Sequence, residues 1–172
     1  MPRFHIIWGT YGSWLPGDPR GFRTRHHRQH VDGDYRSPPP AGRYAGLHAH
    51  ARRSLKQSEV VIPSDLREVV GRRCLERFVE EGVTVAALSV GGCHVHVAIV
   101  CPGDGLKQLV GRVKKTSSHR VRDRLPGRVW QAGCKVVPVR SDHHWDEVLR
   151  YIADHAPQAW VWLAITLGVE RS

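Results

Sequence analysis

The sequence predicts an α+β fold, in which one antiparallel sheet carries helices packed on one face in the ferredoxin-like or RRM-like arrangement. Three observations support this prediction. Segments with strand and helix patterns follow one another in the order strand, helix, strand, strand, helix, strand, helix. The pair Gly91-Gly92 joins the middle two strands as a hairpin. The first two helical segments carry apolar residues at helical spacing, as helices that pack on a sheet do.

The first half of the chain is expected to contain a strand, a long loop and a helix. Aromatic and β-branched residues over 4–10, followed at once by Gly, Pro and Asp, indicate the first strand. Residues from about 11 to 50 are crowded with Gly, Pro, Arg and His, and a loop of that length indicates either a functional segment or a solvated insertion. Pro63-Ser64-Asp65 offers helix-start chemistry, and the apolar spacing continues until Gly82.

A hairpin and a basic helix follow. Residues 83–90 and 93–100 are expected strands, because both are rich in β-branched residues and a glycine turn separates them. Apolar residues at helical spacing then predict a helix over about 106–121, with many Lys and Arg residues on its exposed side.

The last part of the chain is expected to add an edge strand and a closing helix. Residues 135–140 (KVVPVR) indicate an edge strand, because Pro138 has no N–H to donate to a neighbouring strand. A helix is expected over about 144–155, with Asp146 and Glu147 in its first turn, where the helix dipole favours acidic residues. Residues 160–169 fit either a terminal strand or a continuation of that helix.

Length and composition indicate one globular domain spanning residues 1–172. A chain of 172 residues can bury one substantial core but not two, and 41% hydrophobic content is too high for a disordered chain. The 26 Lys and Arg residues exceed the 16 acidic ones, and this net charge of +10 favours a polyanionic partner such as nucleic acid. A basic surface that only keeps the protein soluble is the alternative.

The sequence shows no targeting segment and no redox framework. Neither a signal peptide nor an apolar run of membrane-spanning length is present, so a cytoplasmic protein without membrane contact is expected. The four cysteines lack CxxC spacing, which makes free thiols the expectation and disfavours a zinc knuckle.

A pair of histidines marks the second hairpin strand. His94 and His96 are two residues apart, so both imidazoles lie on one face of the sheet, while Val95 and Val97 enter the core on the other. Two parallel imidazoles can bind a metal ion together. For an isolated pair of this kind, the alternative is two ordinary polar residues on the solvated side of the sheet.

The closing helix offers further groups for the same site. Tyr151 and His155 are four residues apart and therefore share one helix face, beside Glu147 a turn earlier. A third ligand and a hydroxyl nucleophile would then come from one helical surface, although a tyrosine on an amphipathic helix also commonly serves packing.

These groups suit the cleavage of a phosphodiester. A cation that acts as a Lewis acid neutralises charge on the phosphate oxygens, and a phenol becomes a competent nucleophile when a neighbouring base or water takes its proton. Mg²⁺ or Mn²⁺ is the expected cation, although imidazole ligands alone would also tolerate zinc.

Four segments of the chain together resemble one known family. They are FHIIWGTYGSWLPGD, GGCHVHVAIV, VWQAGCKVVPVR and WDEVLRYIADHAP. Each is similar to a segment of the single-tyrosine HUH transposases, which comprise the transposases of the smallest bacterial insertion sequences and their REP-associated relatives. The resemblance covers most of the chain outside the long loop. It departs from the family at Cys93, where relatives often have Asn, and at Ala156-Pro157-Gln158, where they commonly have Asn-Pro.

The resemblance implies a fold of the HUH endonuclease type and a set of roles. It makes His94 and His96 metal ligands, Tyr151 the nucleophile and His155 a third ligand. It also implies a 5′-phosphotyrosine intermediate, a free 3′-hydroxyl and recognition of hairpin-forming single-stranded DNA. Relatives are often dimers, whereas the REP-associated ones look monomeric; a homodimer is the further expectation, with a monomer as the alternative.

Several other residues could contact nucleic acid. Basic residues of the second helix are expected to bind phosphate groups, with a solvated helix face as the alternative. His5 could line the site from the first strand or lie on a solvated sheet face, and Trp14 and Trp130 could stack on bases or pack in the core. The basic residues are Lys114, Lys115, Arg120 and Arg122.

Other functions remain open on this sequence. A catalytically inactive, domesticated transposase kept as a DNA-binding protein would have the same pattern. An RNA-recognition module of the same fold would need aromatic residues on its central strands, whereas the open face of residues 93–100 presents His94, His96 and Ala98. A hydrolase that activates water would leave Tyr151 a structural role.

Overall fold

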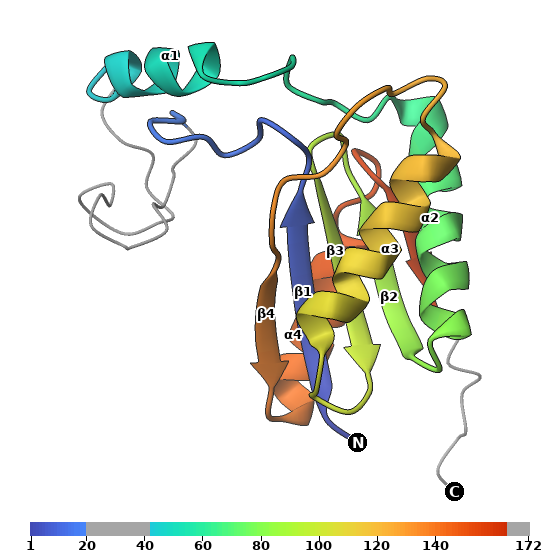
Figure 1. Ribbon diagram of the computed structural model, residues 1–172. Coiled ribbons are helices and arrows are strands. Elements are labelled where there is room, and N and C mark those ends of the chain that lie inside the picture. The colour runs from blue at the N-terminus through green and yellow to red at the C-terminus, as the bar shows by residue number, and fades with distance from the viewer. Residues whose placement is uncertain (20–41, 165–172) are drawn as a thin grey trace, which may run out of the picture.

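The computed structural model describes residues 1–19 and 42–164 of the chain. Within these ranges the strands form a five-stranded antiparallel sheet in the order β4-β1-β3-β2-β5 (Figure 1). The expected α+β, ferredoxin-like fold is therefore confirmed. The strands are β1 (Arg3–Gly9), β2 (Thr84–Val90), β3 (His94–Val100), β4 (Lys135–Val139) and β5 (Trp160–Leu163).

The main core lies between the sheet and two helices, α2 (Ser64–Glu80) and α3 (Leu106–Arg120). Because strand side chains alternate, Val95 and Val97 of β3 both point into this core and are fully buried. Phe78 of α2 closes the core from the helix side. Two helices on one face of the sheet are thus observed as the sequence predicts.

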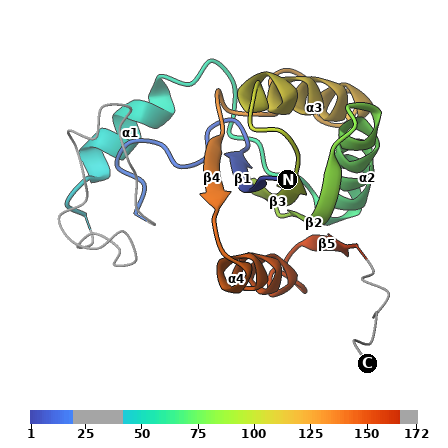
Figure 2. The same cartoon turned by 90° about the horizontal axis from the view of Figure 1, so that it is seen from below.

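A third helix, α4 (Asp142–Ala153), covers part of the opposite face (Figure 2). Its buried residues, Val148 and Ile152, pack against Ala87 of β2 and Ala98 of β3 in a second, smaller apolar cluster. Small alanine side chains allow the helix to approach the sheet closely. The sequence predicts helices on one face of the sheet, whereas in the structure α4 also covers part of the opposite face.

The start of α4 differs from the sequence expectation. The helix begins at Asp142, because the Ser141 hydroxyl caps it by accepting a hydrogen bond from the backbone N–H of His144 at 3.1 Å. Asp142 therefore occupies the first turn, and the prediction that Asp146 and Glu147 lie there is wrong.

A helix, α1 (Ala45–Arg53), begins within the long loop that the sequence predicts over about 11–50, and the loop prediction is wrong for residues 45–50. None of its side chains is buried, so the sequence shows no apolar face that would reveal a helix. The preceding turn packs closely on it, since a Cβ added to Gly17, at φ +85°, would lie 2.5 Å from the backbone nitrogen of His48. Residues 20–41 of the predicted loop lie outside the described residues.

Two further sequence predictions concern the strands at the edges of the sheet. Within residues 1–19 and 42–164, β4 pairs only with β1, which agrees with an edge position for the strand that contains Pro138. β5 pairs with β2, so residues 160–163 form a strand, and residues 165–169 lie outside the described residues. Among the helices of the described ranges, none combines the length and apolar character that a membrane span requires.

Candidate active site

Three histidines from two distant parts of the chain meet on the sheet face that α4 partly covers. His94 and His96 extend from β3 on the side opposite Val95 and Val97, and His155 lies in the turn that follows α4. One ring nitrogen from each histidine lies within 4.8 Å of the others. The three imidazoles therefore form a cluster of the size that one metal ion requires.

Each of the three imidazoles has a partner at Nδ1. Nδ1 of His94 lies 3.5 Å from the Cys93 sulfur, and Nδ1 of His96 lies 3.0 Å from Nε2 of His5. Nδ1 of His155 donates to the Tyr151 carbonyl oxygen at 2.7 Å. Partners of this kind orient metal-binding histidines, because a ring that is held at one nitrogen presents the other to the ion. The donor set thus fits a divalent cation bound through Nε2 atoms.

Burial keeps the inner imidazoles neutral. Burial, with smaller contributions from His94 and His5, lowers the pKa of His96 to about 2. Burial, and then the charge of Lys135, lowers the pKa of His5 to about 4. A neutral imidazole has a lone pair available for a metal, so both groups are in the ligand-competent charge state at neutral pH.

Tyr151 lies beside the histidine cluster of its own chain. Its ring centroid is 5.2 Å from that of His96 and 4.8 Å from that of His155. The adjacent residue Ile152 packs on the sheet, which places Tyr151 at the flank of α4, and its side chain is 49% exposed. Partial burial raises the pKa of the Tyr151 phenol, so the hydroxyl is protonated at neutral pH.

His5 belongs to this site rather than to a solvated sheet face. The side chain is buried, bonds to His96 and has its ring centroid 6.1 Å from that of Tyr151. Glu147, in contrast, is outside the cluster, because its carboxylate pairs with His143 at 3.5 Å near the start of α4.

Sequence reasoning missed three polar residues on the same sheet face. Ser89 lies opposite His96 in β2, and its buried hydroxyl has no hydrogen-bond partner among the described residues. Lys135 lies opposite Ile7, which in turn lies opposite His96. These neighbours depend on strand order and register, for which the sequence carries no local signal.

Gln131 is the third of these residues, and a glycine makes room for it. Gly9 lies opposite His94, and a Cβ added to Gly9 would be 2.8 Å from the Gln131 side-chain nitrogen. The amide of Gln131 therefore lies over Gly9, in the sheet row that contains His94.

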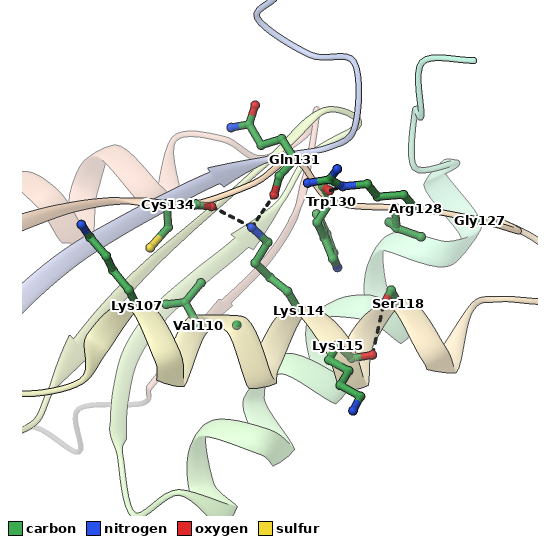
Figure 3. Close-up of a pocket in the computed structure, with 13 residues that line it drawn as sticks. Lys107, Val110, Lys114, Lys115, Ser118, Gly127, Arg128, Trp130, Gln131 and Cys134 are labelled. Carbon is green, nitrogen blue, oxygen red and sulfur yellow. Dashed lines mark hydrogen bonds between the residues drawn. The ribbon is translucent and has the colours of Figure 1, made fainter. Parts of the chain in front are cut away.

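The basic residues of α3 lie on the other face of the sheet, away from the histidine cluster. Lys114 is half-buried, and its ammonium donates to the carbonyl oxygens of Gln131 and Gly133 at 2.6 and 2.7 Å (Figure 3). Lys114 thereby holds the segment that leads into β4. Lys115, Arg120 and Arg122 are exposed, and Arg122 also bonds to His119 at 3.0 Å.

A cavity and a groove adjoin these exposed cations. The cavity, of about 280 Å³, lies between α3 and the segment before β4 and is lined by Lys107, Lys114 and Lys115 among others (Figure 3). The groove, of about 670 Å³, lies between α2 and α3, and Lys115 lines it as well. Lys115 of α3 therefore lines both the cavity and the groove.

The two candidate stacking tryptophans have different environments. Trp130 is buried against Trp8, and its indole N–H donates to the Ser117 hydroxyl at 3.2 Å, so it serves core packing and cannot stack on a base. Trp14 is 41% exposed. It follows Ser13, whose hydroxyl donates to the Cys93 carbonyl at 3.3 Å, and so lies near the start of the histidine strand.

One protein family matches the chain. The model of the family described as "Transposase IS200 like" matches residues 44–155. A solved structure of the REP-associated tyrosine transposase bound to a REP hairpin is similar over 92% of this chain and 75% of that chain, with 11% identity and a TM-score of 0.50. The structure of a candidate transposase from Deinococcus radiodurans R1 covers 88% of both chains, with 16% identity and a TM-score of 0.48. No curated protein matches the chain.

Proposed function

Because the chain belongs to the IS200-like transposase family, we propose that it cleaves and rejoins single-stranded DNA with the Tyr151 hydroxyl as nucleophile. In this proposal His94, His96 and His155 hold a divalent cation. The observation that carries it is the meeting of a phenol and three imidazoles, from elements far apart in sequence, on one face of the sheet.

The cleavage step forms one bond and breaks one. The Tyr151 oxygen attacks the scissile phosphorus and loses its proton to water, a 5′-phosphotyrosine forms, and the 3′-oxygen leaves and takes up a proton as a free hydroxyl. Rejoining is the reverse reaction with the 3′-hydroxyl of another strand. A bound divalent cation would supply Lewis-acid stabilisation of the charge on the phosphate oxygens.

The protein's own residues would position the nucleophile and contact the charged DNA backbone. α4 sets the phenol beside His96, and the neutral imidazoles keep their lone pairs because burial depresses the pKa of His96 and His5. Lys135 lies on the same face, two strands away from His96, and in this proposal its ammonium would contact the phosphate backbone of the reacting strand.

The cation is proposed to be Mg²⁺ or Mn²⁺. A cluster of imidazole nitrogens favours Mn²⁺ of the two, since Mg²⁺ prefers oxygen ligands and retains its water more strongly.

The DNA is proposed to contact more than one surface. Lys115 and Arg120 lie exposed on α3, and Arg122 lies exposed in the turn that follows it, on the side away from the histidine cluster. These residues would bind phosphates of a part of the DNA other than the scissile one. Lys114 has only one N–H left for such a contact after its two bonds to carbonyl oxygens. Trp14 would stack on a base near the site.

Tyr151 is proposed to serve the histidine cluster of its own chain. The support is that the phenol and the three histidines of one polypeptide lie together. A homodimer stays a prediction.

A covalent-adduct assay tests the proposal. The protein is incubated with labelled, hairpin-bearing single-stranded DNA and Mn²⁺, and a denaturing gel separates protein joined to DNA from free DNA. We expect an adduct with the parent protein, none with Tyr151→Phe, and none after His94→Ala or addition of a chelator. Tyr44→Phe is the matched control, since Tyr44 precedes α1, and it should form the adduct normally.

Two outcomes would contradict the proposal. Cleavage without an adduct would indicate a hydrolase that activates water. Binding without cleavage, under conditions in which the metal is bound, would indicate a DNA-binding protein that has lost its activity.

A further inference from the structure

His5 is a buried histidine whose partner is a proposed metal ligand. Its side chain is 9% exposed and that of His96 is 5% exposed, and the two rings share one hydrogen bond of 3.0 Å. We propose that His5 is a positioning residue: it accepts the Nδ1 proton of His96 and so fixes the tautomer in which His96 presents Nε2 to the cation. This inference rests on the metal site proposed above.

The bond between the two rings has two possible directions. Each neutral imidazole carries one N–H and one lone pair. If His96 donates from Nδ1, its Nε2 has the lone pair that a metal needs, and His5 accepts at Nε2. If His5 donates from Nε2 instead, His96 carries its proton on its own Nε2 and cannot bind a metal there. The direction of this hydrogen bond and metal binding are therefore coupled.

The partners of the other two ligands differ from His5. The partner of His155 is the backbone carbonyl of Tyr151, which can only accept, so the tautomer of His155 is set without a metal. The partner of His94 is the Cys93 sulfur at 3.5 Å, a weak hydrogen-bonding group. The tautomer of His96 thus depends on the His5 ring, which can either accept or donate a hydrogen bond.

Water is poorly placed to replace His5. His5 and His96 are both almost entirely buried, which leaves solvent little access to the Nδ1 side of His96. Removal of the acceptor would leave a buried N–H of His96 without a partner, or would turn that ring to the wrong tautomer. Either result weakens metal binding without changing any ligand.

Metal affinity of two His5 variants tests the inference. Mn²⁺ binding is measured by calorimetry for the parent, His5→Leu and His5→Gln, with circular dichroism and thermal unfolding as checks of folding. We expect His5→Leu to bind Mn²⁺ about 10- to 100-fold more weakly, the usual cost of losing a residue that orients a ligand. His5→Gln should recover most of the affinity, because its amide oxygen can accept from Nδ1 of His96.

His50→Leu is the matched control, since His50 is an exposed histidine of α1. It should bind Mn²⁺ as the parent does. A role of His5 in packing alone predicts the reverse order, with the apolar His5→Leu close to the parent and no recovery by His5→Gln.

A tautomer measurement on the parent protein keeps the inference testable if His5→Leu does not fold. Long-range ¹H–¹⁵N spectra with Mg²⁺ bound should show His96 protonated at Nδ1 and His5 unprotonated at Nε2. The opposite assignment would overturn the inference, as would parent-like Mn²⁺ affinity in a folded His5→Leu variant. Failure of the parent itself to bind Mn²⁺ or Mg²⁺ would overturn both this inference and the metal role of the three histidines.

Discussion

Ile152 is the residue through which α4 holds the proposed nucleophile in place. It is 0% exposed and packs with Val148 on Ala87 and Ala98, and it directly follows Tyr151. Ile152→Ala removes a methyl and an ethyl group from this contact. The lost burial and the cavity left behind should cost about 2–4 kcal/mol.

This loss of free energy should favour undocking of α4 from the sheet before it favours unfolding of the whole protein. The buried contacts of α4 lie in the small cluster on its own side of the sheet, whereas the main core lies between the sheet and the helices α2 and α3. A cost of about 2–4 kcal/mol raises the undocked fraction of α4 by about 30- to 1,000-fold. Native-state hydrogen exchange of α4 amides should accelerate to that extent, while β3 amides change much less.

The functional readout is adduct formation as temperature rises. For Ile152→Ala, adduct formation should fail at a temperature at which β3 amides remain protected. Val70→Ala is the control, because Val70 is fully buried in the main core. This variant should have a lower unfolding temperature, but adduct formation and the protection of β3 amides should be lost at the same temperature. Exchange of α4 and β3 amides at one common rate in Ile152→Ala would refute the reasoning, and so would unchanged adduct formation once α4 is undocked.

Four further changes have defined outcomes. Gly71→Ala should lower the unfolding temperature despite the better helix propensity of alanine, because the added Cβ would lie 2.1 Å from the Trp160 ring; a rise in unfolding temperature would contradict this. In chelator-treated protein, urea unfolding should show this contribution to stability in full above pH 6.5, and its loss as the pH falls through about 4 and then about 2. The reason is that His5 and His96 have folded-state pKa values of about 4 and 2 against an ordinary value of 6.5, so the unfolded chain binds more protons in this range. Equal stability at pH 7.5 and pH 5 would argue against it. Lys135→Ala should weaken single-stranded DNA binding and reduce the slope of log K against log salt by about 0.7, one phosphate contact, in a fluorescence titration; an unchanged slope would remove Lys135 from the DNA interface. Finally, calorimetry should show tighter binding of Mn²⁺ than of Mg²⁺ to the parent protein, and the opposite order would indicate oxygen ligands in place of the imidazole set.

Local patterning was sufficient for most of the sheet and for the two helices of the main core. The helical spacing that ends at Gly82 corresponds to α2, and the glycine turn correctly joins β2 to β3. Where an element lacks an apolar face, this signal is absent. α1 buries none of its residues, and the sequence therefore gave no reason to expect a helix there.

The candidate site was predictable in its parts but not in its surroundings. The alternation of β3 places His94 and His96 on one face whatever the rest of the fold does. Sequence reasoning offered Trp130 as a stacking residue, but its burial against Trp8 depends on where the segment before β4 lies. Lys135 enters the site through the pairing of β4 with β1, which no local pattern specifies.

By itself, then, the sequence determined which side chains share a strand or helix face, because the backbone repeats every two residues in a strand and every 3.6 in a helix. The tertiary structure alone decided which faces meet. Ala87 and Ala98 leave room for Ile152 on the sheet, and that contact carries Tyr151 and His155 to the imidazoles of β3. The tertiary structure also decided that His5 lies against His96. Neighbouring strands are brought together by burial of the whole sheet and not by any property of residues adjacent in sequence.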